Sequence, residues 1–219
     1  MSIPTLCLDG LILASASNPS GFSYSLYTQR RGPLREVTTA FLALLVLPYV
    51  LVGAFLWDIH PEWISFRSIS LPLLALALLT VPVALLLEYA IHALASYRPG
   101  SRLIRKITIQ SVWNRRLTPT EYLLLGLVVI GEEIFYRCVW LSILQHEFGV
   151  PLLIALGISS LAYGLNHLAF GTTTVLSKTV SGCLYGALYL LSGHNVLVPI
   201  ITHCLQNIAL FQIGKPKDA

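Results

Sequence analysis

The stretch "VVIGEEIFYRCVW", residues 128–140, places Glu132, Glu133 and Arg137 inside a run that is otherwise apolar. An ionisable group in a membrane-spanning helix costs a few kcal/mol, so it usually serves a site or has a compensating partner. At about 3.6 residues per turn, Glu133 and Arg137 share one helix face, whereas Glu132 points about 100° away. The spacing therefore predicts a buried Glu133–Arg137 ion pair and leaves Glu132 without a partner in its own helix.

Two later apolar segments also carry polar residues, "YGLNH" with Tyr163 and His167, and "HCLQN" with His203 and Asn207. A lone histidine in such a segment is more often a hydrogen-bonded core residue than a catalyst. His203 and Asn207, however, are four residues apart and share one face, so each would need a buried hydrogen-bond partner. This second pair is the stronger indication of a site.

Three separate helices thus carry polar side chains whose hydrogen bonds no single helix can supply: Glu132, His167, and the pair His203 and Asn207. Convergence in one cavity is the least costly solution. There a carboxylate and an imidazole could remove a proton from water, and an imidazole and a carboxamide could donate hydrogen bonds to an oxyanion. These are the groups needed to hydrolyse a peptide bond. Glu132, His167 and His203 could also hold zinc with an open position, although an HExxH arrangement is absent.

The composition indicates the class of protein that holds these residues. Of 219 residues, 55% are hydrophobic and 11% charged, against roughly 25% charged in an ordinary soluble domain. We therefore predict an all-α, polytopic membrane protein with about six transmembrane helices, since each span needs about 20 apolar residues. The expected spans are about 38–57, 71–96, 121–143, 151–169, 173–192 and 197–213. The candidate catalytic residues fall in the carboxyl-terminal four.

The positive charges indicate the orientation in the membrane. They cluster before the first span, in the loop 97–120 and after the last span. By the positive-inside rule, both termini and this loop are predicted to be cytoplasmic. The basic loop lies between two spans and lacks a repeated aromatic pattern, so we expect no nucleic-acid partner.

The chain divides into two predicted regions. Residues 1–37 are interpreted as an N-terminal tail that could lie on the membrane surface, and residues 38–213 as one helical domain without internal repeats. Pro119 and Pro151 are expected to mark helix starts. Gly182 and Gly186, four residues apart, predict close packing between helices.

The polar motifs resemble those of a known family. "EEIFYR", "YGLNH" and "HCLQN" are similar to the EExxxR, FxxxH and HxxxN motifs of the CPBP family, the CAAX-protease and bacteriocin-processing intramembrane peptidases, also called Abi proteins. The order and spacing agree, and the resemblance covers about residues 120–212. Tyr163 stands where the family usually has phenylalanine, which keeps the ring and adds a hydroxyl.

The resemblance implies a multi-pass intramembrane endopeptidase of the cell (cytoplasmic) membrane. Glu132 and His167 would activate the water, His203 and Asn207 would stabilise the tetrahedral intermediate, and Glu133, Arg137 and Tyr163 would support them. The expected partners are the lipid bilayer and a membrane-associated or lipidated peptide or protein substrate. No cofactor is expected to be required, and a zinc-dependent version of the same protease is the alternative mechanism.

Two other function classes remain. One is a non-proteolytic membrane immunity or scaffolding protein that keeps the polar cluster for stability. The presence of all four presumed catalytic residues argues against it. The other is a small transporter with Glu132 as proton relay, against which no inverted repeat is visible. Helix arithmetic also places Glu132 about 18 Å, Asn207 about 9 Å and His167 about 3 Å from the cytoplasmic ends of their spans. These depths do not agree, and helix tilt, an extension of the fourth helix into the cytoplasm or different span boundaries would reconcile them.

Overall fold

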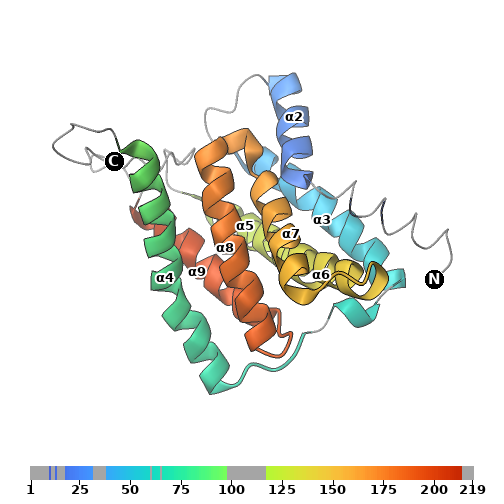
Figure 1. Ribbon diagram of the computed structural model, residues 1–219. Coiled ribbons are helices and arrows are strands. Elements are labelled where there is room, and N and C mark those ends of the chain that lie inside the picture. Colours follow the sequence, from blue (N-terminus) through green and yellow to red (C-terminus); the bar gives the residue numbers. More distant parts are fainter. Residues whose placement is uncertain are drawn as a thin grey trace.

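The computed structural model describes residues 10, 13, 18–31, 38–59, 61–64, 66–97 and 117–213. This part of the chain contains helices and no strand, which confirms the all-α prediction (Figure 1). The α-helices are α2 (Pro19–Arg31), α3 (Thr39–Ile59), α4 (Leu71–Ser96), α5 (Pro119–Glu133), α6 (Trp140–Ser142), α7 (Leu152–Leu165), α8 (Thr172–Leu191) and α9 (Leu197–Ile213). The π-helical segment η2 (Ile134–Val139) joins α5 and α6 into one continuous rod, which a second π-helical segment, η3 (Ile143–Glu147), extends beyond α6. The segments η1 (Pro61–Trp63) and η4 (Leu168–Phe170) are single 3₁₀ turns.

Helices occupy all six apolar stretches that the sequence predicted as spans. By length and composition, one helix in the described ranges, α4, is long and apolar enough to cross a membrane. Three shorter apolar helices are Thr39–Phe55, Leu152–Leu165 and Leu197–Gln212. The six crossings therefore stay a prediction. The basic residues 98–116 and both ends of the chain lie outside the described residues, so the predicted orientation is untested.

The surface of α4 and α7 suits contact with lipid. Leu79 and Leu86 on α4 are 71% and 67% exposed, and Leu153 on α7 is 78% exposed. The buried residues of α4 instead form a narrow stripe of mostly small side chains, Ala77, Thr80, Ala84 and Glu88. Monomeric soluble proteins rarely expose extended apolar surface of this kind.

Local hydrogen bonds fix where α5 begins. Thr118 and Glu121 form a capping box, in which Glu121 Oε2 accepts the Thr118 N–H at 2.9 Å and Thr118 Oγ1 accepts the Glu121 N–H at 3.3 Å. Pro119 occupies the first helical turn, as the sequence predicted. The Thr39 hydroxyl donates to Glu121 Oε1 at 3.0 Å. The start of α5 is thereby tied to the start of α3, which sets the height of Glu132 about three turns later.

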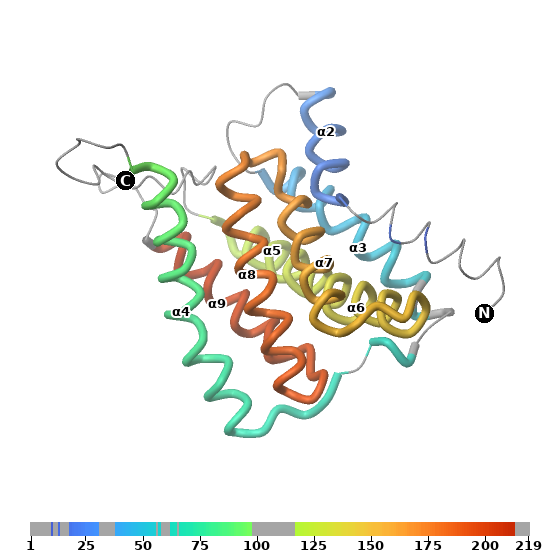
Figure 2. Tube along the Cα trace, in the orientation of Figure 1, coloured from blue at the N-terminus to red at the C-terminus, as the bar shows by residue number. Residues whose placement is uncertain are grey.

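The helix arrangement explains how residues at different predicted depths can meet. The rod of α5 and α6 runs across the direction of α7 and α8 rather than alongside them (Figures 1 and 2). α7 and α8 pack closely on each other, α4 packs on α8 and α9, and α3 packs on α5. A helix that crosses its neighbours can contact them at positions that helix arithmetic assigns to different heights.

Glycines permit the close approach of α7 and α8. A Cβ at Gly182 would lie 3.1 Å from the Ser160 Cα, and one at Gly164 would lie 2.7 Å from the Val175 carbonyl oxygen. A Cβ at Gly186 would also clash with Leu156 of α7. The predicted packing role of Gly182 and Gly186 is therefore confirmed.

The region predicted as a tail contains the helix α2, which packs on α3. The Ser23 hydroxyl donates to the Leu44 carbonyl at 2.8 Å, and the Tyr27 ring meets Phe41 edge-on. Residues Pro19–Arg31 therefore pack as part of the helical assembly. Contact of residues 1–37 with a membrane surface stays a prediction.

Candidate active site

Glu132 stands at the centre of the candidate site, buried at the end of α5. Its Oε1 lies 3.7 Å from His167 Nε2, and its Oε2 lies 4.0 Å from His203 Nε2. His167 belongs to the turn after α7, and His203 belongs to α9. The structure thus brings three of the four predicted catalytic side chains together from three helical segments.

The orientation of His167 follows from its backbone contact. Nδ1 lies 3.0 Å from the Tyr163 carbonyl oxygen, one helical turn earlier. A carbonyl oxygen can only accept, so Nδ1 carries the proton in the neutral ring and the Nε2 lone pair faces Glu132. Since Nε2 and Glu132 Oε1 are 3.7 Å apart, one water could hydrogen-bond to both at about 2.8 Å.

His203 is held by the neighbouring carboxylate. Its Nδ1 lies 2.8 Å from Glu133 Oε1, while Glu133 Oε2 lies 3.1 Å from Arg137 Nε. The predicted Glu133–Arg137 pair is present and fully buried. Glu133 has a second partner in His203 that the sequence did not indicate, because the contact spans 70 residues.

The other nitrogen of His203 meets a hydroxyl. Nε2 lies 3.3 Å from the Tyr163 hydroxyl. With Nδ1 donating to Glu133, the neutral ring accepts at Nε2, so the hydroxyl donates there. To donate from Nε2 to an oxyanion, His203 would have to carry both protons, and Glu133 is placed to balance that charge. The hydroxyl that distinguishes Tyr163 from phenylalanine is therefore in contact with a candidate catalytic group.

Arg137 is enclosed by aromatic rings. Its guanidinium carbon lies 4.9 Å from the Tyr163 ring centroid and 5.7 Å from that of Tyr185. Nη1 and Nη2 are buried without a hydrogen-bond partner in the described ranges, so Glu133 and the two rings surround the charge. Arg137 lies in the π-helical segment η2, and such segments are frequent at functional sites.

Three residues near Glu132 were not assigned from the sequence. Asn166 Nδ2 lies 3.4 Å and the Tyr49 hydroxyl 3.5 Å from Glu132 Oε1, as two donors to the carboxylate. Asn166 Oδ1 accepts the Ser20 N–H at 2.8 Å, and its Nδ2 donates to Ser20 Oγ at 2.9 Å. Asn166 carried a signal, since it is a polar residue beside His167 in an apolar run. Tyr49 and Ser20 carried none, because tyrosine and serine are ordinary residues in α3 and α2.

Asn207, the fourth predicted catalytic residue, lies one turn after His203 on α9 and is half-buried. In the described part of the chain, no hydrogen bond or ion pair joins its side chain to Glu132 or His167. Its predicted role in binding an oxyanion depends on a substrate and stays a prediction.

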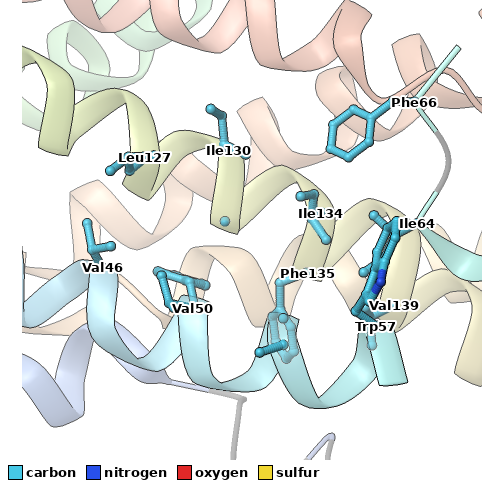
Figure 3. A pocket seen from close by; sticks show the side chains of 14 residues that line it. Val46, Val50, Trp57, Ile64, Phe66, Leu127, Ile130, Ile134, Phe135 and Val139 are labelled. Carbon is cyan, nitrogen blue, oxygen red and sulfur yellow. The ribbon is translucent and has the colours of Figure 1, made fainter. Parts of the chain in front are cut away.

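An apolar cavity of about 280 Å³ lies between α3 and the rod of α5 and η2 (Figure 3). Tyr49, Gly131 and Ile134 are among the residues that line it. A Cβ at Gly131 would lie 2.6 Å from the Tyr49 Cβ, so the glycine lets Tyr49 approach the backbone beside Glu132. An apolar space therefore adjoins the helix that carries the candidate base.

The donor set is compatible with zinc as well as with water. Both histidines use Nδ1 for a hydrogen bond and direct Nε2 toward the Glu132 carboxylate, and histidines that bind metals are commonly held in this way by a hydrogen bond at the other ring nitrogen. In the described residues, no group of three His, Cys, Asp or Glu side chains has the geometry of a metal site.

Residues 115–209 match a family model described as type II CAAX prenyl endopeptidase, Rce1-like. This range contains the three motifs and every predicted catalytic residue. No curated protein and no solved structure matches the chain.

Proposed function

We propose that this chain, which carries an Rce1-like domain of the CAAX protease family over residues 115–209, is an intramembrane endopeptidase that uses a water activated by glutamate and histidine. The observation that carries the mechanism is the convergence of the buried Glu132 and His203 with the partly buried His167, with both Nε2 atoms turned toward one carboxylate. Ionisable groups are costly in this setting, and chemistry at the cluster would explain them.

The first step is attack by water on the scissile carbonyl carbon. A water between Glu132 Oε1 and His167 Nε2 gives up a proton as its oxygen forms the new bond to carbon. Either group can accept the proton, since one is a carboxylate and the other has a free lone pair. Asn166 and Tyr49 donate to Glu132 Oε1 and hold the carboxylate in place.

The second step is collapse of the tetrahedral intermediate. His203, as imidazolium, and Asn207 would donate hydrogen bonds to its oxyanion, and Glu133 would balance the charge on His203. The carbon–nitrogen bond then breaks, and the proton held by Glu132 or His167 passes to the leaving amine. The products are a new carboxylate and a new amine, and the enzyme regains its starting state.

The proposed substrate is a membrane-associated or lipidated peptide or protein in the bilayer. Exposed leucines of α4 and α7 support a lipid surround. The apolar cavity beside Tyr49 supports an apolar group of the substrate near the site. The proposed location is the cell membrane, with several crossings and cytoplasmic termini.

The mechanism proposed here requires no metal. In the zinc-dependent alternative, Glu132, His167 and His203 would hold the ion, which would supply an activated water. Glu133 and the Tyr163 carbonyl would then fix the two rings from their far sides.

The test is cleavage of a defined peptide by the full chain in lipid vesicles. The probe is an internally quenched, S-farnesylated peptide ending in a CAAX sequence, followed by mass spectrometry in ¹⁸O-labelled water. We expect cleavage at one bond, with ¹⁸O in the new carboxylate, and none with His167→Ala. A second arm coexpresses the chain with any precursor peptide that a neighbouring gene encodes. If neither substrate is cleaved, the scaffolding function is favoured instead. If His167→Ala cleaves at the parental rate, the role given to His167 is wrong.

A further inference from the structure

A second buried polar chain begins at His203 and leads away from Glu132. The Tyr185 ring of α8 stacks on the imidazole of His203, with centroids 4.7 Å apart and planes at 23°. The Tyr185 hydroxyl donates a hydrogen bond to Gln206 Oε1. Since His203 and Gln206 are three residues apart on α9, one tyrosine spans both.

This series of polar contacts ends in a charged pair that joins α4 and α8. Gln206 Nε2 donates to Glu88 Oε2 of α4 at 2.6 Å, and Glu88 Oε1 lies 3.6 Å from Lys178 Nζ of α8. Tyr185 and Gln206 are fully buried, Glu88 is 4% exposed and Lys178 is 9% exposed. These polar contacts thus join α4, α8 and α9. Of these helices, α4 lies outside the residues that match the family model.

The charge on Glu88 sets the direction of every hydrogen bond in this chain. A carboxylate only accepts, so Gln206 must present its NH₂ group to Glu88 and its oxygen to Tyr185. The Tyr185 hydroxyl must then be the donor. A neutral residue at position 88 would let the Gln206 amide turn around and would leave the tyrosine without a fixed acceptor.

The ring of His203 is consequently held in two ways. Glu133 fixes it in its own plane through Nδ1, and Tyr185 covers one face. A rotation of the imidazole about its bond to Cβ would break both contacts. The double restraint keeps Nε2 directed at the Tyr163 hydroxyl and at Glu132 Oε2.

We infer that Tyr185 is a positioning residue for His203, and that Gln206 and the Glu88–Lys178 pair hold Tyr185 in place. This inference rests on the proposed function, because its effect on rate requires His203 to act in peptide hydrolysis. It gives the buried charges of α4 and α8 a purpose that packing does not supply, since lipid-facing helices can pack through small residues alone.

The experiment compares three variants with a matched control in the farnesylated-peptide assay. Tyr185→Leu removes the ring, Tyr185→Phe removes the hydroxyl and Glu88→Gln removes the charge. Tyr189→Leu is the control, because it deletes a buried tyrosine ring one turn along the same helix. Loss of orientation typically costs up to 10²-fold. We expect kcat to fall about 10- to 100-fold for Tyr185→Leu and about 3-fold for Tyr185→Phe and Glu88→Gln, with KM unchanged.

A second readout does not depend on activity. In ¹⁵N-histidine spectra of the full chain, the His203 signal is assigned by its loss in His203→Ala. We expect this signal to shift in Tyr185→Leu and to stay in place in Tyr189→Leu. If the parental chain cleaves nothing, the proposed function fails and the spectra alone decide the positioning role. An unshifted signal, an unchanged kcat for Tyr185→Leu, or an equal loss in Tyr189→Leu overturns the inference.

Discussion

Glu132 and Glu133 are neighbours in α5, and their carboxylates lie in different surroundings. Glu133 is fully buried between a cation and an imidazole, with Arg137 Nε at 3.1 Å and His203 Nδ1 at 2.8 Å. Glu132 receives only long contacts, from Asn166 at 3.4 Å, Tyr49 at 3.5 Å and the two histidine Nε2 atoms.

This difference indicates a structural role for Glu133 and a chemical role for Glu132. A carboxylate held by two fixed charged or polar partners at about 3 Å is already committed to them and is a weak candidate for accepting a proton from water. A carboxylate with loose contacts to neutral groups can exchange them for a water. We therefore assign the proton transfer to Glu132 and the organisation of His203 to Glu133.

The largest expected effect separates the two glutamates directly. Glu132→Gln keeps the volume and removes the base, so the cleavage rate should fall by about 10⁴-fold, while thermal stability in detergent stays close to the parental value. Glu133→Gln should lower thermal stability in addition to the cleavage rate, because Arg137 and His203 lose the charge of their shared partner. If Glu132→Gln cleaves at the parental rate, the proteolytic mechanism is wrong.

Arg137→Ala tests the structural side of the comparison. Removal of one partner of a buried pair costs on the order of 3–5 kcal/mol, so the yield of folded protein and its melting temperature should both fall. Size-exclusion chromatography and thermal unfolding measure this. Normal yield and stability with lost activity would place Arg137 in the chemistry.

Asn207→Ala tests the oxyanion side of the site. Loss of one oxyanion donor typically costs about 10²–10³-fold in kcat. Stability should hardly change, because the Asn207 side chain is only half-buried. Steady-state kinetics should show the loss in kcat with a constant KM. An unchanged kcat would leave His203 as the oxyanion donor proposed here.

Tyr49→Phe tests whether the loose contacts of Glu132 matter. The lost hydrogen bond, at 3.5 Å, is worth about 1 kcal/mol, or roughly 5-fold in rate. Tyr136→Phe is the control, because the Tyr136 hydroxyl is buried without a hydrogen-bond partner in the described part of the chain. A larger loss in the control than in Tyr49→Phe would contradict the role given to Tyr49.

The smallest expected effect is that of chelators. If water activation needs only Glu132 and His167, stripping metal should leave the cleavage rate within about twofold. In the zinc-dependent alternative, bound zinc would be required for every turnover, so stripping it would abolish cleavage. The measurement pairs an activity assay with metal analysis of the purified chain. About one zinc per chain, with activity lost on removal and restored on addition, would establish the zinc-dependent alternative.

Much of the fold was predictable because its signals are local. Runs of apolar residues predicted the positions of the helices, and Pro119 predicted the start of α5, where the structure adds a capping box of Thr118 and Glu121. The Glu133–Arg137 pair followed from the helical repeat, since a spacing of four residues survives in the π-helical segment. The resemblance to the family was also recognisable, because three short motifs in one order are specific, and residues 115–209 match an Rce1-like family model.

The rest required the tertiary structure because it joins residues that are far apart in the chain. Upright parallel helices would keep Glu132 and His167 at different depths, whereas the rod of α5 and α6 runs across the direction of α7 and α8 (Figure 1), and Glu132 lies 3.7 Å from His167. The contact of Glu133 with His203 spans 70 residues, and that of Gln206 with Glu88 spans 118. A sequence with helical periodicity determines which face of each helix is polar. Only the packing of helices decides which polar faces meet, since many pairings would satisfy the same groups and their relative energies depend on the whole set of contacts.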